Sequence, residues 1–274
     1  MHSDIKAVLT QLMRGARAIL GNDFVGGYLV GSTATGDFDA YSDVDFLIVT
    51  RQELSTPQVD ALQILHSEVR SMDVIWAEKL EGSYFPRRKL GSHDVTGTNL
   101  WYLENGHRTL APSAHDDTLV VRWVFRERGI AFDGPAPHSL TPPVPIDALK
   151  AEVLSTMRAI PRYIVEEPIA SPGASSKAEA PTLHFWNRRF GQSFAVLTCC
   201  RIMHTLETGR VESKKKAVEW ALTAIDPPWT GLIERAWAGR GGDFDSPADP
   251  AEYASTLEFY EWAVSESMKS VNSD

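Results

Sequence analysis

Two apolar segments joined by a short polar connection, residues 24–30 and 44–50, constrain the fold of this chain more than any other feature. Both are rich in Val, Ile, Leu, Phe and Tyr and are bounded by Gly, Ser and Asp, a composition typical of buried strands. Asp43 and Asp45 stand two residues apart where the second strand begins, so their carboxylates project from one face. Such a pair can hold a hard divalent cation, and the stretch therefore predicts two strands that carry a metal site.

The polar connection begins with Gly31 and Ser32, whose small side chains would let main-chain amides approach a phosphate closely. Gly31 and Gly36 have the spacing of a P-loop, but Asp37 and Phe38 occupy the positions that require Lys and Ser or Thr. A calcium-binding loop is excluded as well, because its central glycine and terminal glutamate are missing. The connection is therefore a candidate phosphate-binding site that is neither a P-loop nor a calcium-binding loop.

The residues G-S-T-A-T-G-(x5)-S-D-V-D, beginning at Gly31, resemble the signature of the DNA polymerase β-type nucleotidyltransferase superfamily. The resemblance implies that Gly31, Ser32 and Ser42 contact the triphosphate of a nucleotide. It also implies that Asp43 and Asp45 bind Mg²⁺, with two ions expected. The alternative, an acidic hairpin turn with solvated aspartates, is disfavoured because the strand, the Gly-Ser turn and the D-x-D pair occur together in the required order.

Nucleotidyl transfer also needs a carboxylate that accepts the proton of the attacking hydroxyl group. Residues 71–77 predict a third strand, on which period-2 alternation places Asp73 and Glu78 on opposite faces, so at most one of them can face the metal ions. The superfamily keeps its third acid in an apolar strand of this kind. This resemblance favours Asp73 as the catalytic base and third carboxylate of the metal site, whereas Glu78, beside Lys79, is expected to be a solvated charge.

Helical spacing of apolar residues and the positions of cap residues predict the helices of the first half. One helix is expected to end near Gly21 and to pack on the sheet, and another begins with Thr56 and Pro57. Residues 80–115 show no periodicity. After them, a helix capped by Asp116 and Asp117 is expected to end at Gly129.

The second half of the chain shows helical spacing only. Pro161 is expected to kink or end the helix over residues 147–165, and residues 168–181 have the Pro, Ala and Ser content of a linker. Further helices are predicted over residues 182–208, 213–226 and 249–268. The predicted fold is therefore α+β, with a nucleotidyltransferase domain of a small mixed sheet and helices over residues 1–145, and an all-helical domain over residues 146–274.

A second resemblance concerns residues 201–221, R-I-M-H-T-L-E-T-G-R-V-E-S-K-K-K-A-V-E-W-A. They look like the C-terminal helical domain of aminoglycoside 3''-adenylyltransferases, the streptomycin and spectinomycin resistance enzymes. That resemblance implies that Arg201 and Lys214 contact the phosphates of ATP and that Asp117 touches the nucleotide. By itself, Lys214 is equally consistent with a solvated K-K-K face, whereas Arg201 lies in an apolar stretch where a charge needs a partner.

The same resemblance places the acceptor site just before the helix that carries Arg201, where Trp186 and Asn187 become candidates for substrate binding. The resistance enzymes hold their cationic antibiotics there with acidic and aromatic side chains. This chain has aromatic residues but also Arg188 and Arg189, and a like charge near a cationic ligand is unfavourable. The acceptor is therefore predicted only as a small hydroxyl compound, with aminoglycosides as the first candidates.

The composition indicates which kinds of partner the protein can bind and in which cellular compartment it is expected. The chain of 274 residues has 27 basic and 36 acidic residues, a net charge of −9 that argues against nucleic-acid binding. Cys199 and Cys200 are adjacent in an apolar helical stretch and are expected to fill the core. The sequence shows neither a signal peptide nor an apolar run of membrane-spanning length, so a cytoplasmic protein without a membrane partner is expected.

These observations predict Mg²⁺-dependent transfer of AMP from ATP, the co-substrate, to a hydroxyl group of a small molecule such as streptomycin or spectinomycin. One alternative is an adenylyltransferase that modifies a protein or another acceptor. Such enzymes are usually little more than the first domain, so the length of this chain argues against it. Another alternative is a regulatory module that binds nucleotides without catalysis, which has no need of a third acid.

Overall fold

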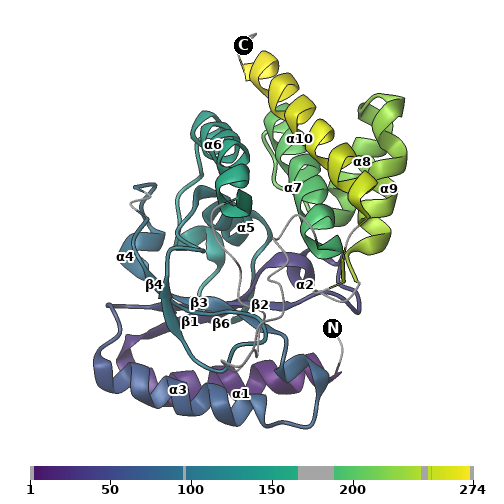
Figure 1. Ribbon diagram of the computed structural model, residues 1–274. Coiled ribbons are helices and arrows are strands. Elements are labelled where there is room, and N and C mark those ends of the chain that lie inside the picture. Colours follow the sequence, from purple (N-terminus) through teal and green to yellow (C-terminus); the bar gives the residue numbers. More distant parts are fainter. Residues whose placement is uncertain (1–2, 95–96, 166–187, 242–245, 248, 272–274) are drawn as a thin grey trace. The chain divides into compact units, whose positions relative to one another are not determined.

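The computed structural model describes residues 3–94, 97–165, 188–241, 246–247 and 249–271 (Figure 1). The chain divides into two compact units, Met1–Pro145 and Ile146–Asp274. The first unit contains the sheet and the second is built from helices. The predicted α+β fold class is therefore confirmed.

The first unit is organised around a six-stranded mixed sheet with the strand order β5-β4-β3-β2-β1-β6. Strands β2 and β3 pair in parallel, whereas all the other neighbouring strands pair antiparallel. A parallel pair requires a crossover connection, and helix α3 provides it. The strands are β1 (Phe24–Leu29), β2 (Val44–Thr50), β3 (Leu80–Pro86), β4 (Leu100–Leu103), β5 (Ala111–Ser113) and β6 (Ile130–Asp133).

Helices cover both faces of this sheet (Figure 1). On one face, α1 (Ser3–Leu20) and α3 (Thr56–Arg70) pack side by side and bury a large apolar cluster with the strands. Gly27 of β1 allows α1 to approach closely, because a side chain there would collide with the sulfur of Met13. On the other face, α5 (Leu119–Arg128) contributes Phe125 to a smaller cluster. The short helices are α2 (Gly31–Thr35) and α4 (Arg87–Leu90).

The helices predicted in the first half are confirmed with two changes in capping, because α3 is capped by Ser55 instead of Thr56 and α5 is not capped by Asp116 and Asp117. Helix α1 ends at Leu20, and α3 begins after Ser55, which forms a capping box with Gln58. Helix α5 begins after Thr118, whose hydroxyl accepts a hydrogen bond from the main-chain nitrogen of Val121 at 3.1 Å. The cap is therefore Thr118 and not the preceding Asp116–Asp117 pair.

The strand predicted over residues 71–77 is wrong. These residues form a turn and a 3-10 helix, Ile75–Ala77, and the strand comes later as β3. Three of their apolar side chains, Met72, Val74 and Trp76, are nevertheless part-buried and pack against the cluster under α1 and α3. β3 escaped prediction because Gly82 interrupts its apolar pattern. A side chain at Gly82 would collide with the main-chain oxygen of Phe46 on the neighbouring strand.

In the second unit, α7 (Arg189–Thr208) is the central helix and packs against all the others. It ends at Gly209, which has a φ of 67°, and Cys199 and Cys200 are buried in it as predicted. Ser213 caps the next helix through a hydrogen bond from Lys216 N. The other helices are α6 (Ile146–Val165), α8 (Lys214–Ala224), α9 (Thr230–Gly239) and α10 (Pro250–Val271).

Two further features of the helices bear on the predictions. Helix α6 continues through Pro161 to Val165, so Pro161 does not end this helix, and the alternative expectation of a kink stays a prediction. In the described part of the chain, no helix is long and apolar enough to span a membrane.

Candidate active site

Four carboxylates of the first unit lie on one face of the sheet and are called the acid face: Asp43, Asp45, Glu81 and Asp116. Asp45 of β2 is paired in register with Glu81 of β3, and paired residues of parallel strands point to the same side. Asp43 precedes Asp45 by two residues and so shares its face, as the sequence predicted. The acid face therefore forms where the two parallel strands begin.

The Gly31–Ser32 turn lies directly against the carboxylate of Asp45. Gly31 has a φ of 62°, and a side chain there would collide with Oδ2 of Asp45, so only glycine fits this position. The main-chain nitrogen of Val30 also donates a hydrogen bond to the main-chain oxygen of Asp45 at 3.1 Å. Ser32 follows in the first turn of α2 and is part-exposed. The two halves of the predicted motif are thus adjacent in space.

The loop before β2 is held by its own polar residues. The hydroxyl of Ser42 donates to Oδ1 of Asp39 and accepts from the nitrogen of Asp39, both at 3.1 Å. The amide of Asn105 donates to Oδ1 of Asp43 at 2.6 Å and connects this loop to the segment after β4. Ser42 therefore shapes the loop that presents Asp43, and its predicted phosphate contact remains a prediction.

Glu81 combines burial with nearby polar groups. Its side chain is 22% exposed, and its Oε1 accepts a hydrogen bond from the hydroxyl of Tyr102 at 2.6 Å. The ring nitrogen Nε2 of His115 lies 3.8 Å from the same oxygen. Burial raises the pKa of Glu81, and the negative charges of Asp43 and Asp116 raise it further, against the hydrogen bond from Tyr102. A raised pKa makes a carboxylate a stronger base, and a stronger base is better suited to proton abstraction.

Asp116 completes the acid face from the segment before α5. Its Oδ2 accepts a hydrogen bond from the hydroxyl of Ser83 at 2.6 Å. Ser83 stands two residues after Glu81 on β3, which places it on the same face. Burial raises the pKa of Asp116 as well. The loop that carries Asp116 also places the ring of His115 on Tyr102, with centroids 5.0 Å apart and the planes tilted by 24°.

Asp73, the base and third metal-site carboxylate predicted from the sequence, is not part of the acid face. It is exposed in the turn after α3, and its neighbours Met72 and Val74 pack into the cluster on the opposite face of the sheet. Glu81 takes the position expected for Asp73, with the acid in a buried strand beside Asp45. Glu78 is 62% exposed, as predicted, and lies 3.8 Å from Arg70.

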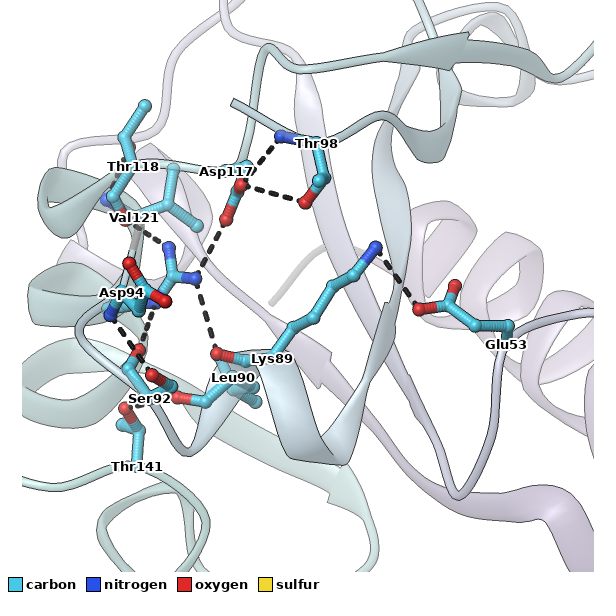
Figure 2. A network of polar contacts seen from close by, with 11 residues as sticks. Glu53, Lys89, Leu90, Ser92, Asp94, Thr98, Asp117, Thr118, Val121 and Thr141 are labelled. Atoms are coloured by element: carbon cyan, nitrogen blue, oxygen red, sulfur yellow. Dashed lines mark hydrogen bonds and ion pairs between the residues drawn. The ribbon is translucent and has the colours of Figure 1, made fainter. Parts of the chain in front are cut away.

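Asp117 is also placed differently from its prediction as a nucleotide contact (Figure 2). Its Oδ1 accepts a hydrogen bond from Arg122 at 2.7 Å, and neither side chain is more than 1% exposed. Its Oδ2 accepts hydrogen bonds from the nitrogen and the hydroxyl of Thr98 at 3.1 and 3.2 Å. Arg122 further donates to the main-chain oxygens of Ser92 and Lys89. Asp117 therefore connects α5 to the chain before β4 and is not part of the acid face.

The two predicted phosphate-binding cations belong to the second unit. Arg201 of α7 is part-buried, and its Nε donates to the main-chain oxygen of Glu212 at 3.4 Å. Lys214 is the exposed first residue of α8, two residues after Glu212. Both cations are thus held near the junction of α7 and α8. The predicted acceptor residues Trp186 and Asn187 lie outside the described residues.

Mg²⁺ prefers oxygen ligands, and the acid face supplies carboxylate oxygens. Within the ranges that the structure describes, no group of three or more His, Cys, Asp or Glu side chains is arranged to bind a metal ion together. Mg²⁺ in nucleotide sites is typically held by one or two carboxylates, with substrate phosphates and water completing its shell. The carboxylates of Asp43 and Asp45, beside the Gly31–Ser32 turn, fit that arrangement.

The sequence-based predictions missed Glu81 and several polar groups near the acid face. Glu81, Tyr102, Asn105 and His115 all lie in the region without periodicity, where short strands and glycines obscure the alternation. One signal was present in residues 80–85. The polar residues Glu81 and Ser83 alternate there with Leu80, Gly82 and Tyr84, as expected for a strand with one polar face. Recognising it would have required accepting a glycine inside a strand.

Two family models match the chain. Residues 25–89 match the nucleotidyltransferase domain, which includes the Gly31–Ser32 turn, Asp43, Asp45 and Glu81. Residues 174–260 match the C-terminal domain of aminoglycoside adenylyltransferase, which includes Arg201 and Lys214.

Curated relatives and a solved structure agree with these matches. Spectinomycin 9-adenylyltransferase of Staphylococcus aureus (strain N315) is 23% identical over 251 residues, covering 86% of this chain and 85% of the relative. The protein of that name from Campylobacter jejuni is 22% identical, covering 86% of each chain. The relatives carry the designation 9, whereas the sequence-based resemblance was to the 3'' enzymes.

A crystal structure of spectinomycin adenyltransferase from Enterococcus faecialis with ATP and spectinomycin has a similar fold. The TM-score is 0.69 at 13% identity, and the match covers 95% of this chain and 99% of that one. The two matched domains agree with the relatives and with the acid face. They indicate that the chain is an adenylyltransferase similar to the aminoglycoside adenylyltransferases.

Proposed function

We propose that this protein transfers AMP from ATP to a hydroxyl group of an aminoglycoside-type antibiotic, with spectinomycin as the first candidate and streptomycin as the second. The observation that carries the proposal is the register of β2 and β3, which brings Asp45 and Glu81 side by side next to the Gly31–Ser32 turn. The names of the relatives, spectinomycin 9-adenylyltransferases, support the choice of acceptor.

In the proposed reaction, each part of the acid face has a separate task. Asp43 and Asp45 would hold Mg²⁺, which supplies Lewis-acid stabilisation of the charge on the transferred phosphoryl group. Gly31, Ser32 and Ser42 bind the triphosphate next to the aspartates, so that the α-phosphorus faces the acceptor. In this arrangement the attacking hydroxyl is held close enough for an in-line displacement.

Glu81 is the proposed general base. Its carboxylate accepts the proton of the acceptor hydroxyl while that oxygen forms a bond to the α-phosphorus, and the bond from the α-phosphorus to the pyrophosphate oxygen breaks. The pKa of Glu81, raised mainly by burial, favours this role because a weakly basic, fully solvated carboxylate accepts a proton less readily.

Arg201 and Lys214 are proposed to bind ATP phosphates from the second unit. Fixed cations would offset the triphosphate charge that remains after metal binding. The second unit is also proposed to act as the domain that positions nucleotide and acceptor, with its boundary at residues 145–146. Trp186 and Asn187 remain the proposed acceptor contacts, and the reaction is expected in the cytoplasm, where ATP is available.

The two arginines beside the proposed acceptor contacts differ in exposure. Of the two arginines that follow the acceptor candidates, Arg188 is only 3% exposed, whereas Arg189 is exposed at the beginning of α7. Arg188 is therefore a buried group of the second unit, and of these two arginines only Arg189 presents its side chain at the surface.

The test is an assay of the purified full-length protein with ATP and Mg²⁺, with spectinomycin or streptomycin added separately. We expect pyrophosphate release that depends on the antibiotic, together with an antibiotic whose mass has increased by one AMP group. Expression in a sensitive bacterium should raise the inhibitory concentration of the modified antibiotic, and the Glu81→Gln variant should not. If ATP binds but neither antibiotic is adenylylated, the proposed acceptor class is wrong.

A further inference from the structure

Tyr102 makes a direct hydrogen bond to the proposed base from the neighbouring strand. Its hydroxyl lies 2.6 Å from Oε1 of Glu81, a short distance typical of a hydroxyl that donates to a carboxylate. The strand register explains the contact. Tyr102 of β4 is paired with Ser83 of β3, and Glu81 stands two residues from Ser83 on the same face, within the diagonal reach of a tyrosine side chain.

The surroundings of Tyr102 restrict its own movement. Its residue is 7% exposed, β4 lies between β3 and β5 in the sheet, and its partner on β5 is Ala111. The ring of His115 covers it in a stacked arrangement. The main-chain nitrogen of His115 donates a hydrogen bond to the hydroxyl of Ser113, at the end of β5, at 3.1 Å. The donor to Glu81 is therefore a rigid, covered ring and not a mobile surface side chain.

A glutamate side chain needs such an anchor to act as a base. It has several rotatable bonds, and an unanchored carboxylate spends much of its time away from the acceptor hydroxyl. Proton abstraction requires an oxygen within hydrogen-bond distance of the proton, and a misplacement of about 1 Å can reduce a rate about a hundredfold. A donor on one carboxylate oxygen fixes the direction in which the other oxygen points.

We propose that Tyr102 is a positioning residue for AMP transfer: its hydroxyl holds Oε1 of Glu81, so that Oε2 is directed at the acceptor hydroxyl. The inference rests on the proposed role of Glu81 as the base. It differs from a purely structural role, in which Tyr102 would only satisfy a buried carboxylate and stabilise the sheet. The two roles have different consequences for kcat, for nucleotide binding and for variants that already lack the base.

The first test is the Tyr102→Phe variant, which keeps the ring and removes the hydroxyl. With spectinomycin as acceptor, kcat should fall about tenfold or more, whereas KM for ATP and the Kd for ATP should stay within about twofold of the wild-type values. Tyr28→Phe is the matched control. Tyr28 lies on β1, which β2 separates from β3, and its hydroxyl donates to the main-chain oxygen of Pro135 at 2.9 Å. The kcat of Tyr28→Phe should stay within about twofold of the wild-type value.

The decisive test is a double-mutant cycle with Glu81→Gln, measured under single-turnover conditions. If Tyr102 acts through the base, adding Tyr102→Phe to Glu81→Gln should reduce the remaining rate by less than about twofold. An equal fold loss in both backgrounds, or an unchanged kcat in Tyr102→Phe alone, would overturn the inference. A second variant, His115→Ala, should lower kcat with the same unchanged KM, because it removes the ring that covers Tyr102.

The outcomes separate this inference from the proposed function. If the wild-type protein does not transfer AMP, or if Glu81→Gln keeps the wild-type rate, the proposed function itself is wrong. If Glu81→Gln is inactive and Tyr102→Phe is fully active, the proposed function stands and only the positioning role is wrong. Thermal unfolding of each variant, with the melting temperature within a few degrees of wild type, shows that a lost rate is not lost folding.

Discussion

Asp116 and Asp117 are adjacent in the sequence, but they belong to two polar regions of the first unit with opposite properties. Asp117 is buried against Arg122, and the network of Figure 2 fixes it with further hydrogen bonds from Thr98. Asp116 belongs to the acid face, where Ser83 donates to it and where Glu81 is held by the hydroxyl of Tyr102. One region pairs its carboxylate with a protein cation, and the other gathers carboxylates around neutral donors.

This difference separates stability from chemistry. A buried carboxylate that is matched by an arginine has its charge compensated within the fold, and removing the partner leaves an isolated charge. Carboxylates that gather on one face repel one another and have raised pKa values, an arrangement that favours ligands with positive charge and proton transfer. The acid face should therefore control turnover, and the Asp117–Arg122 network should control folding.

The largest expected effect is on turnover. Asp45→Asn or Asp43→Asn should reduce AMP transfer by about 10³-fold or more, because an amide cannot replace a carboxylate as a ligand of Mg²⁺ and Lewis-acid stabilisation amounts to several kcal/mol. The melting temperature should stay near the wild-type value. Asp60→Asn, at an exposed position of α3, is the control and should be fully active. A variant at Asp43 or Asp45 with more than a tenth of wild-type activity would contradict the metal assignment.

The second prediction concerns the Asp117–Arg122 network. Arg122→Met should lower the free energy of unfolding by about 3–5 kcal/mol in urea titrations, because the carboxylate of Asp117 is left buried without its partner. The matched control is Arg17→Met. It breaks the ion pair with Asp133, whose side chains are 53% and 37% exposed, and should cost less than about 1 kcal/mol. Similar losses in both variants would remove the proposed distinction between the regions.

The third prediction is a pH dependence from the opposite face of the sheet. His66 is buried beside Tyr84, whose hydroxyl lies 2.9 Å from its Nε2, and burial lowers the pKa of His66 from 6.5 to about 4. Between these values the unfolded chain binds a proton that the folded chain does not. Stability from this residue is therefore complete above about pH 6.5 and declines as the pH falls towards 4, by about 3 kcal/mol in total.

His66→Gln can isolate this contribution, because glutamine can still bond to Tyr84 but does not titrate. Glu81 and Asp116 act in the opposite direction, since burial raises their pKa values and the folded state then gains protons first as the pH falls. The measured quantity is the difference in unfolding free energy between wild type and His66→Gln from pH 7 to pH 4. A constant difference over that range would show that His66 is not buried as a neutral group.

The smallest expected effect concerns ATP binding by the second unit. Arg201→Ala and Lys214→Ala should each raise the Kd for ATP by about five- to tenfold in calorimetry, since a hydrogen bond to a charged group contributes about 1–2 kcal/mol. Lys215→Ala is the control from the same exposed run and should change the Kd by less than about twofold. Unchanged affinity in both Arg201→Ala and Lys214→Ala would contradict the assigned role of these cations.

Much of the first unit could be predicted because its signals are local. Alternation and the D-x-D spacing located β1, β2 and the aspartate pair, and the Thr56–Pro57 pair located the start of α3. Glu81, the proposed base, could not be found in this way. Met72, Val74 and Trp76 have a strand-like composition but bury their side chains from a turn, whereas Gly82 lies inside the real strand because the neighbouring main chain leaves no room for a side chain.

The roles of Asp116 and Asp117 could not be separated by sequence for a related reason. Both carboxylates precede the same helix, and only the tertiary partners distinguish them, with Arg122 one turn further along α5 and Ser83 on β3. Such partners are distant in sequence or offset by a helical turn, and no local spacing reports them. The position of the site was therefore predictable, and the residue that completes it was not.

The most direct test of the central claim is the rate of AMP transfer to spectinomycin by Glu81→Gln and Asp73→Asn, measured side by side with ATP binding. We predict that Glu81→Gln loses about 10²- to 10⁴-fold in kcat while it still binds ATP, because the general base is gone and the triphosphate site is intact. Asp73→Asn should stay within about twofold of wild type, since its side chain is exposed in a turn. The reverse pattern, with Asp73→Asn inactive and Glu81→Gln active, would contradict the account.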